Sequence, residues 1–249
     1  MSMLNTMLNT MLNTMLNTIL DYYTKKFQNS SDIKKLQIYI LISNLRFVNT
    51  SLLNKIKDNI DENDKEMYKD LSHINLKNTN LSSISFIGAN LKNAYLEGAN
   101  LKGTNLKKAN LKNANLKKVN LENANLKFAN LENAYLGNAN LNKANLENAK
   151  LKGTYLKNAD LNKVNLENAN LECANLKNAN LKKGNLYCAN LKNANLENTW
   201  LVSIYLEKAK LESTSLKYAN LEFANLKNAN LKKGNLYCAN LKNANLENT

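Results

Sequence analysis

Side chains able to perform acid–base, nucleophilic or metal chemistry are scarce in this chain. The only histidine is His73, which leaves little for a general base or a zinc site. The three cysteines, Cys173, Cys188 and Cys238, form an odd number without close spacing, which fits free thiols in a reducing compartment better than a disulfide framework. No Ser/His/Asp or Cys/His constellation and no glycine-rich phosphate loop is present. We therefore expect a non-catalytic protein with no metal and no cofactor.

The residues between positions 200 and 223 point to a different chemistry, the binding of another molecule by surface contact. Apolar and aromatic side chains interrupt an otherwise polar sequence here, which predicts a protein-binding site made of Trp200, Val202, Tyr205, Tyr218 and Phe223. Two alternatives stay open: a decayed stretch without function, or a packing site for the N-terminal segment.

Basic side chains gather in residues 101–120, which contain six lysines and no acidic residue: Lys102, Lys107, Lys108, Lys112, Lys117 and Lys118. This basic girdle is a candidate site for phosphate or an acidic protein surface, although solubility alone would also explain it. The whole chain has a formal charge of +14, from 34 Lys and Arg against 20 Asp and Glu. Such a balance permits nucleic acid, an anionic membrane or an acidic protein as partner and selects none of them.

The elements that must position these side chains fall into three parts. Residues 1–20 repeat the tetrapeptide MLNT and form a low-complexity tail. Residues 21–70 have an apolar pattern after Ser31 and Asp32 that predicts a short helical segment, too small to bury much core alone. Residues 71–249 form the main domain. The chain has no proline and only seven glycines, which argues against an active site built from shaped loops.

A five-residue period runs through the main domain. Leucine occupies 34 of the 35 positions taken in steps of five from Leu76 to Leu246, with Phe86 as the one exception. The residue two places earlier is small, and it is Ala at 23 of the 35 positions. Five residues turn an α-helix by about 500° and send successive strand residues to opposite faces, so neither element can bury this pattern. The backbone must bend once per repeat, which predicts a solenoid.

The Ala-Asn-Leu-x-x tandem, as in Ala109-Asn110-Leu111-Lys112-Asn113, resembles the pentapeptide-repeat family over residues 71–249. The resemblance implies an all-β solenoid, a right-handed quadrilateral β-helix with one repeat per side and four per coil, here preceded by the short α-helical segment. Leu and the small residue would point inward, and Asn side chains would stack and hydrogen-bond along the rod. Nearly nine coils at a spacing of about 4.8 Å give a rod about 40 Å long.

Stacking in steps of 20 residues places Tyr95, Tyr135 and Tyr155 in one column, interrupted by Asn115. Lysines such as Lys117 line the neighbouring column, and aromatic rings interleaved with lysines can bind single-stranded nucleic acid. The plainer interpretation is a solvated surface, and the absence of arginine from the repeats weakens the case for nucleic acid.

Our first hypothesis for the function is a non-catalytic scaffold that binds a protein partner. The resemblance implies an alternative, since some family members mimic duplex DNA and bind DNA gyrase. Those members are acidic, whereas residues 71–249 here hold 25 Lys against 12 Asp and Glu, a charge of +13. A third hypothesis is binding of nucleic acid or an anionic membrane through the basic girdle.

Two further expectations concern assembly and location. An uncapped last coil would be an open sheet edge and favours a homodimer through the C-terminal end. The first twenty residues carry no Lys or Arg, and the longest apolar run near the N-terminus, residues 36–42, is too short to span a bilayer. We therefore expect a cytoplasmic protein without a transmembrane segment, with secretion by a signal-independent route left open.

Overall fold

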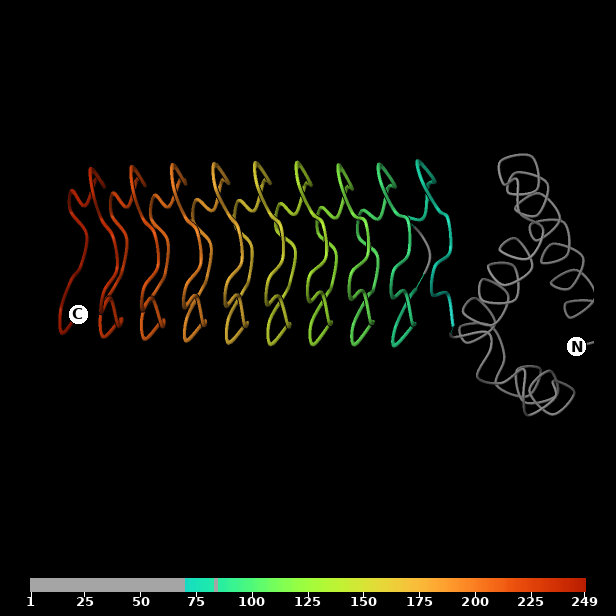
Figure 1. Ribbon diagram of the computed structural model, residues 1–249, viewed down its shortest axis with the longest axis horizontal. Coiled ribbons are helices and arrows are strands. Elements are labelled where there is room, and N and C mark those ends of the chain that lie inside the picture. The colour runs from blue at the N-terminus through green and yellow to red at the C-terminus, as the bar shows by residue number, and fades with distance from the viewer. Residues whose placement is uncertain (1–69, 83–84) are drawn as a thin grey trace, which may run out of the picture. The chain divides into compact units, whose positions relative to one another are not determined.

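The computed structural model describes residues 70–82 and 85–249, which form a stack of coils (Figure 1). The chain divides into two compact units, Met1–Leu71 and Ser72–Thr249. The predicted MLNT tail (1–20) and the predicted helical segment (21–70) lie outside the described residues, apart from Asp70.

Each repeat turns the chain once, at the two residues that follow the leucine. In a representative turn the amide of Ala109 donates to the carbonyl of Leu106 at 2.9 Å, and Lys108 has a φ of 60°. A positive φ at the third of four turn residues is the sign pattern of a type II turn. Every described repeat has a positive φ at this position, and Asn fills 15 of these positions. The turn also accepts residues that rarely adopt this conformation, such as Phe128 and Cys173.

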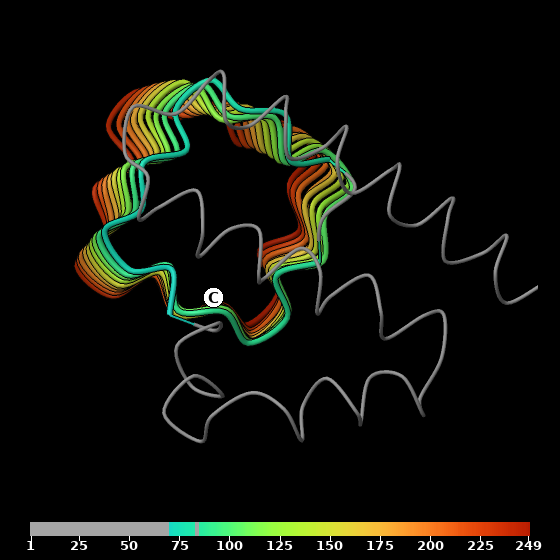
Figure 2. The ribbon, with the colours of Figure 1, turned by 90° about the vertical axis from the view of Figure 1, so that its right-hand side faces the viewer.

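The turns stack because each coil pairs with the next in parallel. The residue before each leucine forms an isolated bridge with the residue 20 places later, from Asn75↔Tyr95 to Asn225↔Asn245. The pairing therefore confirms four repeats per coil. In the described residues, β-structure consists of these single bridges rather than longer strands. Viewed along its axis, the coil has a four-sided outline (Figure 2), which confirms the quadrilateral β-helix that the resemblance implies.

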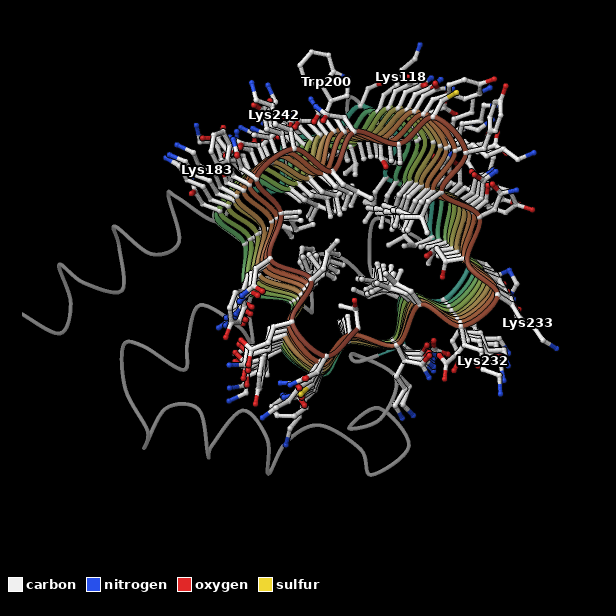
Figure 3. The ribbon with its side chains drawn as sticks, turned by 90° about the vertical axis from the view of Figure 1, so that its left-hand side faces the viewer. Lys118, Lys183, Trp200, Lys232, Lys233 and Lys242 are labelled. Atoms are coloured by element: carbon white, nitrogen blue, oxygen red, sulfur yellow. The ribbon has the colours of Figure 1, made fainter. Side chains whose placement is uncertain are left out.

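The interior is made of the leucines and the small residues that precede them by two places. From Leu71 to Leu226 the leucines are buried, and Phe86 occupies a leucine position with no exposed surface. The leucines of the last coil are more open, and Leu246 is exposed. Side chains at these two positions project into the lumen while the other three positions face outward (Figure 3). Where threonine replaces alanine, its hydroxyl is satisfied locally: the hydroxyls of Thr104 and Thr154 each donate to the carbonyl of the leucine three residues earlier at 2.7 Å. The predicted core is therefore confirmed.

The asparagine between Ala and Leu stabilises both the turn and the stack. Its side-chain oxygen accepts a hydrogen bond from the amide two residues later, as between Asn110 Oδ1 and Lys112 N at 3.2 Å. Its Nδ2 donates to the equivalent asparagine one coil earlier, as from Asn110 to Asn90 at 3.2 Å. These bonds confirm the predicted asparagine stacking and explain why Asn recurs at this position.

We number the four faces by the first residue of each bridged column, which then continues in steps of 20. The first face begins at Asn75, the second at Asn80, the third at Ser85 and the fourth at Asn90. The corner between two faces consists of the two turn residues that follow each leucine. Bridged positions and corners together carry all the outward side chains.

Candidate binding surfaces

Trp200 stands on the second face, where it replaces an asparagine in the bridged column between Asn180 and Asn220. Its ring is 54% exposed and projects outward between the corners that carry Lys118 and Lys183 (Figure 3). The ammonium of Lys182, from the preceding coil, lies 4.1 Å from the ring centroid, which is a cation–π contact. Lys182 thus contacts one face of the Trp200 ring, and the rest of the ring is largely exposed to solvent.

Three more exposed aromatic rings lie on the two coils that follow Trp200. Tyr218 and Phe223 occupy the two corners that border the second face, and both are more than half exposed. Tyr237 packs edge-on against Tyr218 with ring centroids 5.7 Å apart. We call Trp200, Tyr218, Phe223 and Tyr237 the aromatic patch; the half-buried Val202 lies beside it at the second–third corner. The sequence prediction missed Tyr237, although its offset of 19 residues from Tyr218 places it on the same corner.

Tyr205 belongs to a different cluster from Trp200. The chain turns at Val202 and Ser203, so Tyr205 lies on the third face, bridged to Asn185 and Asn225. Its ring stacks on Tyr187 with centroids 5.9 Å apart. The sequence prediction placed Tyr205 in one contact site with Trp200, but the corner between them directs the two side chains to adjacent faces.

Charged partners hold the Tyr187–Tyr205 pair in place. The Tyr205 hydroxyl donates to Glu207 at 2.7 Å, and this bond to a carboxylate raises the pKa of Tyr205. The Lys208 ammonium donates to the Tyr187 hydroxyl at 3.0 Å, which raises the pKa of Lys208. Since the polar ends of both rings are engaged within the chain, this pair is a weaker candidate for partner binding than the aromatic patch.

The six lysines of the basic girdle are distributed over all four corners. Two of them are paired with glutamates of the following coil: Lys102 with Glu122 at 2.9 Å and Lys112 with Glu132 at 3.0 Å. The contact with Lys102 lowers the pKa of Glu122. Among the described residues, no carboxylate lies within ion-pair distance of the other four: Lys107, Lys108, Lys117 and Lys118. The girdle is therefore partly neutralised by the next coil.

The tyrosine column of the first face is also present. Tyr95 bridges to Asn115, Asn115 to Tyr135, and Tyr135 to Tyr155. A hollow of about 470 Å³ opens at the asparagine, between Tyr95 and Tyr135, with Lys117 at its edge. Lys117 lies close to the tyrosine column, as predicted, because it belongs to the corner between Asn115 and the second face.

Groups for metal or thiol chemistry are dispersed in the described part of the chain. No three His, Cys, Asp or Glu side chains within residues 70–82 and 85–249 come close enough to hold a metal ion. The cysteines Cys173, Cys188 and Cys238 are free thiols at corner positions. The same residues include no helix with the length and apolar character needed to cross a membrane.

Comparison with known proteins gives one family model, described as pentapeptide repeats. It matches residues 70–103, 84–123, 120–158, 129–168, 159–199, 189–227 and 204–248. Among curated proteins, no sequence matches the chain significantly.

Several solved structures resemble the chain. HetL, a pentapeptide repeat protein from the cyanobacterium Nostoc involved in heterocyst differentiation regulation, is 32% identical, with 71% of this chain and 86% of that chain covered and a TM-score of 0.40. Full-length QnrB1, a plasmid-mediated fluoroquinolone resistance protein, is 16% identical, with 68% and 87% covered and a TM-score of 0.37. A protein of the Arabidopsis thaliana thylakoid lumen is 24% identical, with 43% and 70% covered and a TM-score of 0.33.

Proposed function

This chain belongs to the pentapeptide-repeat family, and from that premise we propose that it is a non-catalytic rod that binds a protein partner through the aromatic patch. The observation that carries the proposal is the patch itself. Four aromatic rings, each more than half exposed, gather on one face and its two corners near Trp200. Elsewhere the bridged columns of this face hold Asn or Asp.

Exposed aromatic rings of this kind suit a protein interface. Tyr and Trp are enriched among the residues that dominate binding energy, because they bury much apolar area with few rotatable bonds. Trp200 lies on backbone that bridges to Asn180 of the preceding coil and to Asn220 of the following coil. Its amide donates to the carbonyl of Ala179, and its carbonyl accepts from the amide of Leu181. Binding on such a fixed surface loses little conformational entropy, which favours affinity.

The charge of the rod argues against the main alternative. A mimic of duplex DNA needs a negative surface, and the repeats have a charge of +13. Binding of a polyanion by the basic girdle is weakened by the pairing of Lys102 and Lys112 with glutamates. HetL takes part in heterocyst differentiation regulation and QnrB1 in fluoroquinolone resistance, so neither role transfers to this chain.

The repeat itself supplies a variant that removes the patch and keeps the rod. Trp200→Asn and Tyr218→Asn restore the residue that neighbouring coils have at these positions, Asn180 and Asn198. Phe128→Asn is the matched control, because Phe128 is an exposed corner aromatic outside the patch.

Affinity capture from host lysate should then give one or more proteins with wild type and the Phe128 control that the double variant loses. Equal unfolding midpoints in urea would exclude a folding defect. If every captured protein is retained by the double variant, the aromatic patch is not the binding surface.

A further inference from the structure

The hollow on the first face is separate from the aromatic patch. Tyr95 and Tyr135 stand two coils apart in one column, so their backbones are separated by about 9.6 Å, twice the strand spacing. The short side chain of Asn115 between them leaves the hollow of about 470 Å³. This volume lies within the range of about 300–1,000 Å³ typical of small-ligand sites.

The two tyrosines form open aromatic walls. Tyr95 is 47% exposed and Tyr135 is 52% exposed. Lys77 approaches Tyr95 at 5.9 Å from the ring centroid, and it comes from the coil on the side opposite Asn115. The third tyrosine of the column differs, since Tyr155 lies against Gly137, where a Cβ would come within 3.1 Å of its ring. Only Tyr95 and Tyr135 therefore offer ring surface to the hollow.

The floor of the hollow is a fixed amide. Asn115 Oδ1 accepts a hydrogen bond from the Lys117 amide at 3.2 Å, and its Nδ2 donates to Glu97 at 3.4 Å. These bonds hold the Asn115 side chain in one orientation. The side chain therefore does not rotate into the space above it, and the hollow is preformed.

One side of the hollow is a polar ladder along the fourth–first corner. Asn113 Nδ2 donates to Asn93 Oδ1 at 3.2 Å, and Asn93 Nδ2 lies 3.2 Å from His73 Nε2. Because Asn93 uses its oxygen for Asn113, its amide group is the donor and His73 Nε2 is the acceptor. This side presents amide donors and acceptors to an occupant.

The opposite side carries a positive charge. Lys117 lines the hollow, and no carboxylate of the described residues forms an ion pair with it. A site with two aromatic walls, amide groups on one side and a free ammonium on the other suits a planar heteroaromatic ring that bears an anion. Ring stacking on tyrosine and pairing of phosphate with lysine are the two contacts that bind bases in unpaired nucleic acid.

We propose that the hollow between Tyr95 and Tyr135 binds a nucleobase stacked on the tyrosines, with its phosphate on Lys117. The occupant is either a free nucleotide or one unpaired base of a single strand, since both present this chemistry. Duplex DNA does not, because its bases are already stacked and paired.

The test uses the full chain and three probes: adenosine monophosphate, a fluorescein-labelled deoxyadenosine octamer, and the duplex of that octamer. Binding is followed by calorimetry for the nucleotide and by fluorescence anisotropy for the two oligonucleotides. Binding of the nucleotide assigns a free-nucleotide site, and binding of the single-stranded octamer alone assigns a strand site. No binding of either at millimolar concentration, or equal binding of the duplex, would overturn the proposal.

Matched variants connect the binding to the hollow. Tyr95→Asn with Tyr135→Asn restores the asparagine of neighbouring coils and should weaken binding by at least about tenfold. Lys117→Gln should weaken binding severalfold and reduce its salt dependence. The control is Lys107→Gln, which removes an unpaired lysine of the same girdle at another corner and should leave binding unchanged. Equal losses for the two lysine variants with no loss for the tyrosine variant would show non-specific charge attraction and refute the site.

Discussion

Substitution of a single corner residue, Asn158, tests the turn on which the whole rod depends. Asn158 has a φ of 59°, the left-handed conformation that favours Gly and Asn. Its side chain is exposed and takes part in a ladder: Nδ2 donates to Asn138 at 3.3 Å, and Oδ1 accepts from Asn178 at 3.1 Å. Because the side chain is exposed, the effect of a substitution separates into hydrogen bonds and backbone conformation.

The expected losses of stability form a graded series. Asn158→Gly removes the two exposed hydrogen bonds and should cost about 1 kcal/mol. Asn158→Ala removes the same bonds and places a Cβ in the left-handed region, which raises the loss to about 2 kcal/mol. Asn158→Val adds the crowding of a branched Cβ and should cost about 3 kcal/mol.

The measurement is the free energy of unfolding in urea, with the same three substitutions at Lys157 as the control. Lys157 occupies the preceding turn position, where φ is not positive. Valine should be tolerated there at least as well as glycine, so the order of the two variants reverses between adjacent residues. If Asn158→Val is as stable as Asn158→Gly, Asn158 does not have a left-handed backbone conformation. The turn would then lie at other residues of the repeat.

Two further predictions concern the core and the surface charges. Leu141→Ala removes a leucine with no exposed surface from a middle coil and should lower the free energy of unfolding by about 2–5 kcal/mol. Ile87→Ala, at an exposed corner, should change the free energy of unfolding by less than about 1 kcal/mol. Urea unfolding of both variants measures the difference. Lys102 lowers the pKa of Glu122, which contributes stability at neutral pH that is lost as pH falls through that pKa. The stability of Glu122→Gln should therefore fall less than that of wild type between about pH 6 and 3. Unfolding followed by circular dichroism over this pH range measures the difference.

The interior of the rod could be predicted from the sequence because only one backbone geometry buries a five-residue period. Leucine and the small residue before it must both face inward, and neither a helix nor a straight strand permits this. The number of sides does not follow from the period, since a coil of three or five repeats would bury the same residues. The four-sided coil came from the family resemblance, and the bridges in steps of 20 confirm it.

Steps of 20 residues predict which side chains stack in one column, but they do not say at which residues of each repeat the chain turns from one face to the next. Trp200 and Tyr205 are five residues apart and look like one cluster in the sequence. The corner at Ser203, where φ is 54°, separates them. The pairing of Lys102 with Glu122 and of Lys112 with Glu132 follows from the step of 20, although the charges within residues 101–120 alone do not reveal it.

The positions at which the chain departs from its own repeat identify the surfaces that the fold alone does not explain. At a bridged position the asparagine side chain accepts a hydrogen bond from the turn and donates one to the coil before it, and an aromatic side chain can make neither bond. Each aromatic substitution there gives up stability of about 1 kcal/mol and exposes apolar surface. The chain makes this substitution on the first face at Tyr95, Tyr135 and Tyr155, and again at Trp200 and Tyr205. Tyr155 packs on Gly137 and Tyr205 stacks on Tyr187. Tyr95, Tyr135 and Trp200 stay about half exposed, although a lysine lies over the ring of Tyr95 and of Trp200. These three are therefore the rings for which binding of another molecule is the remaining physical reason.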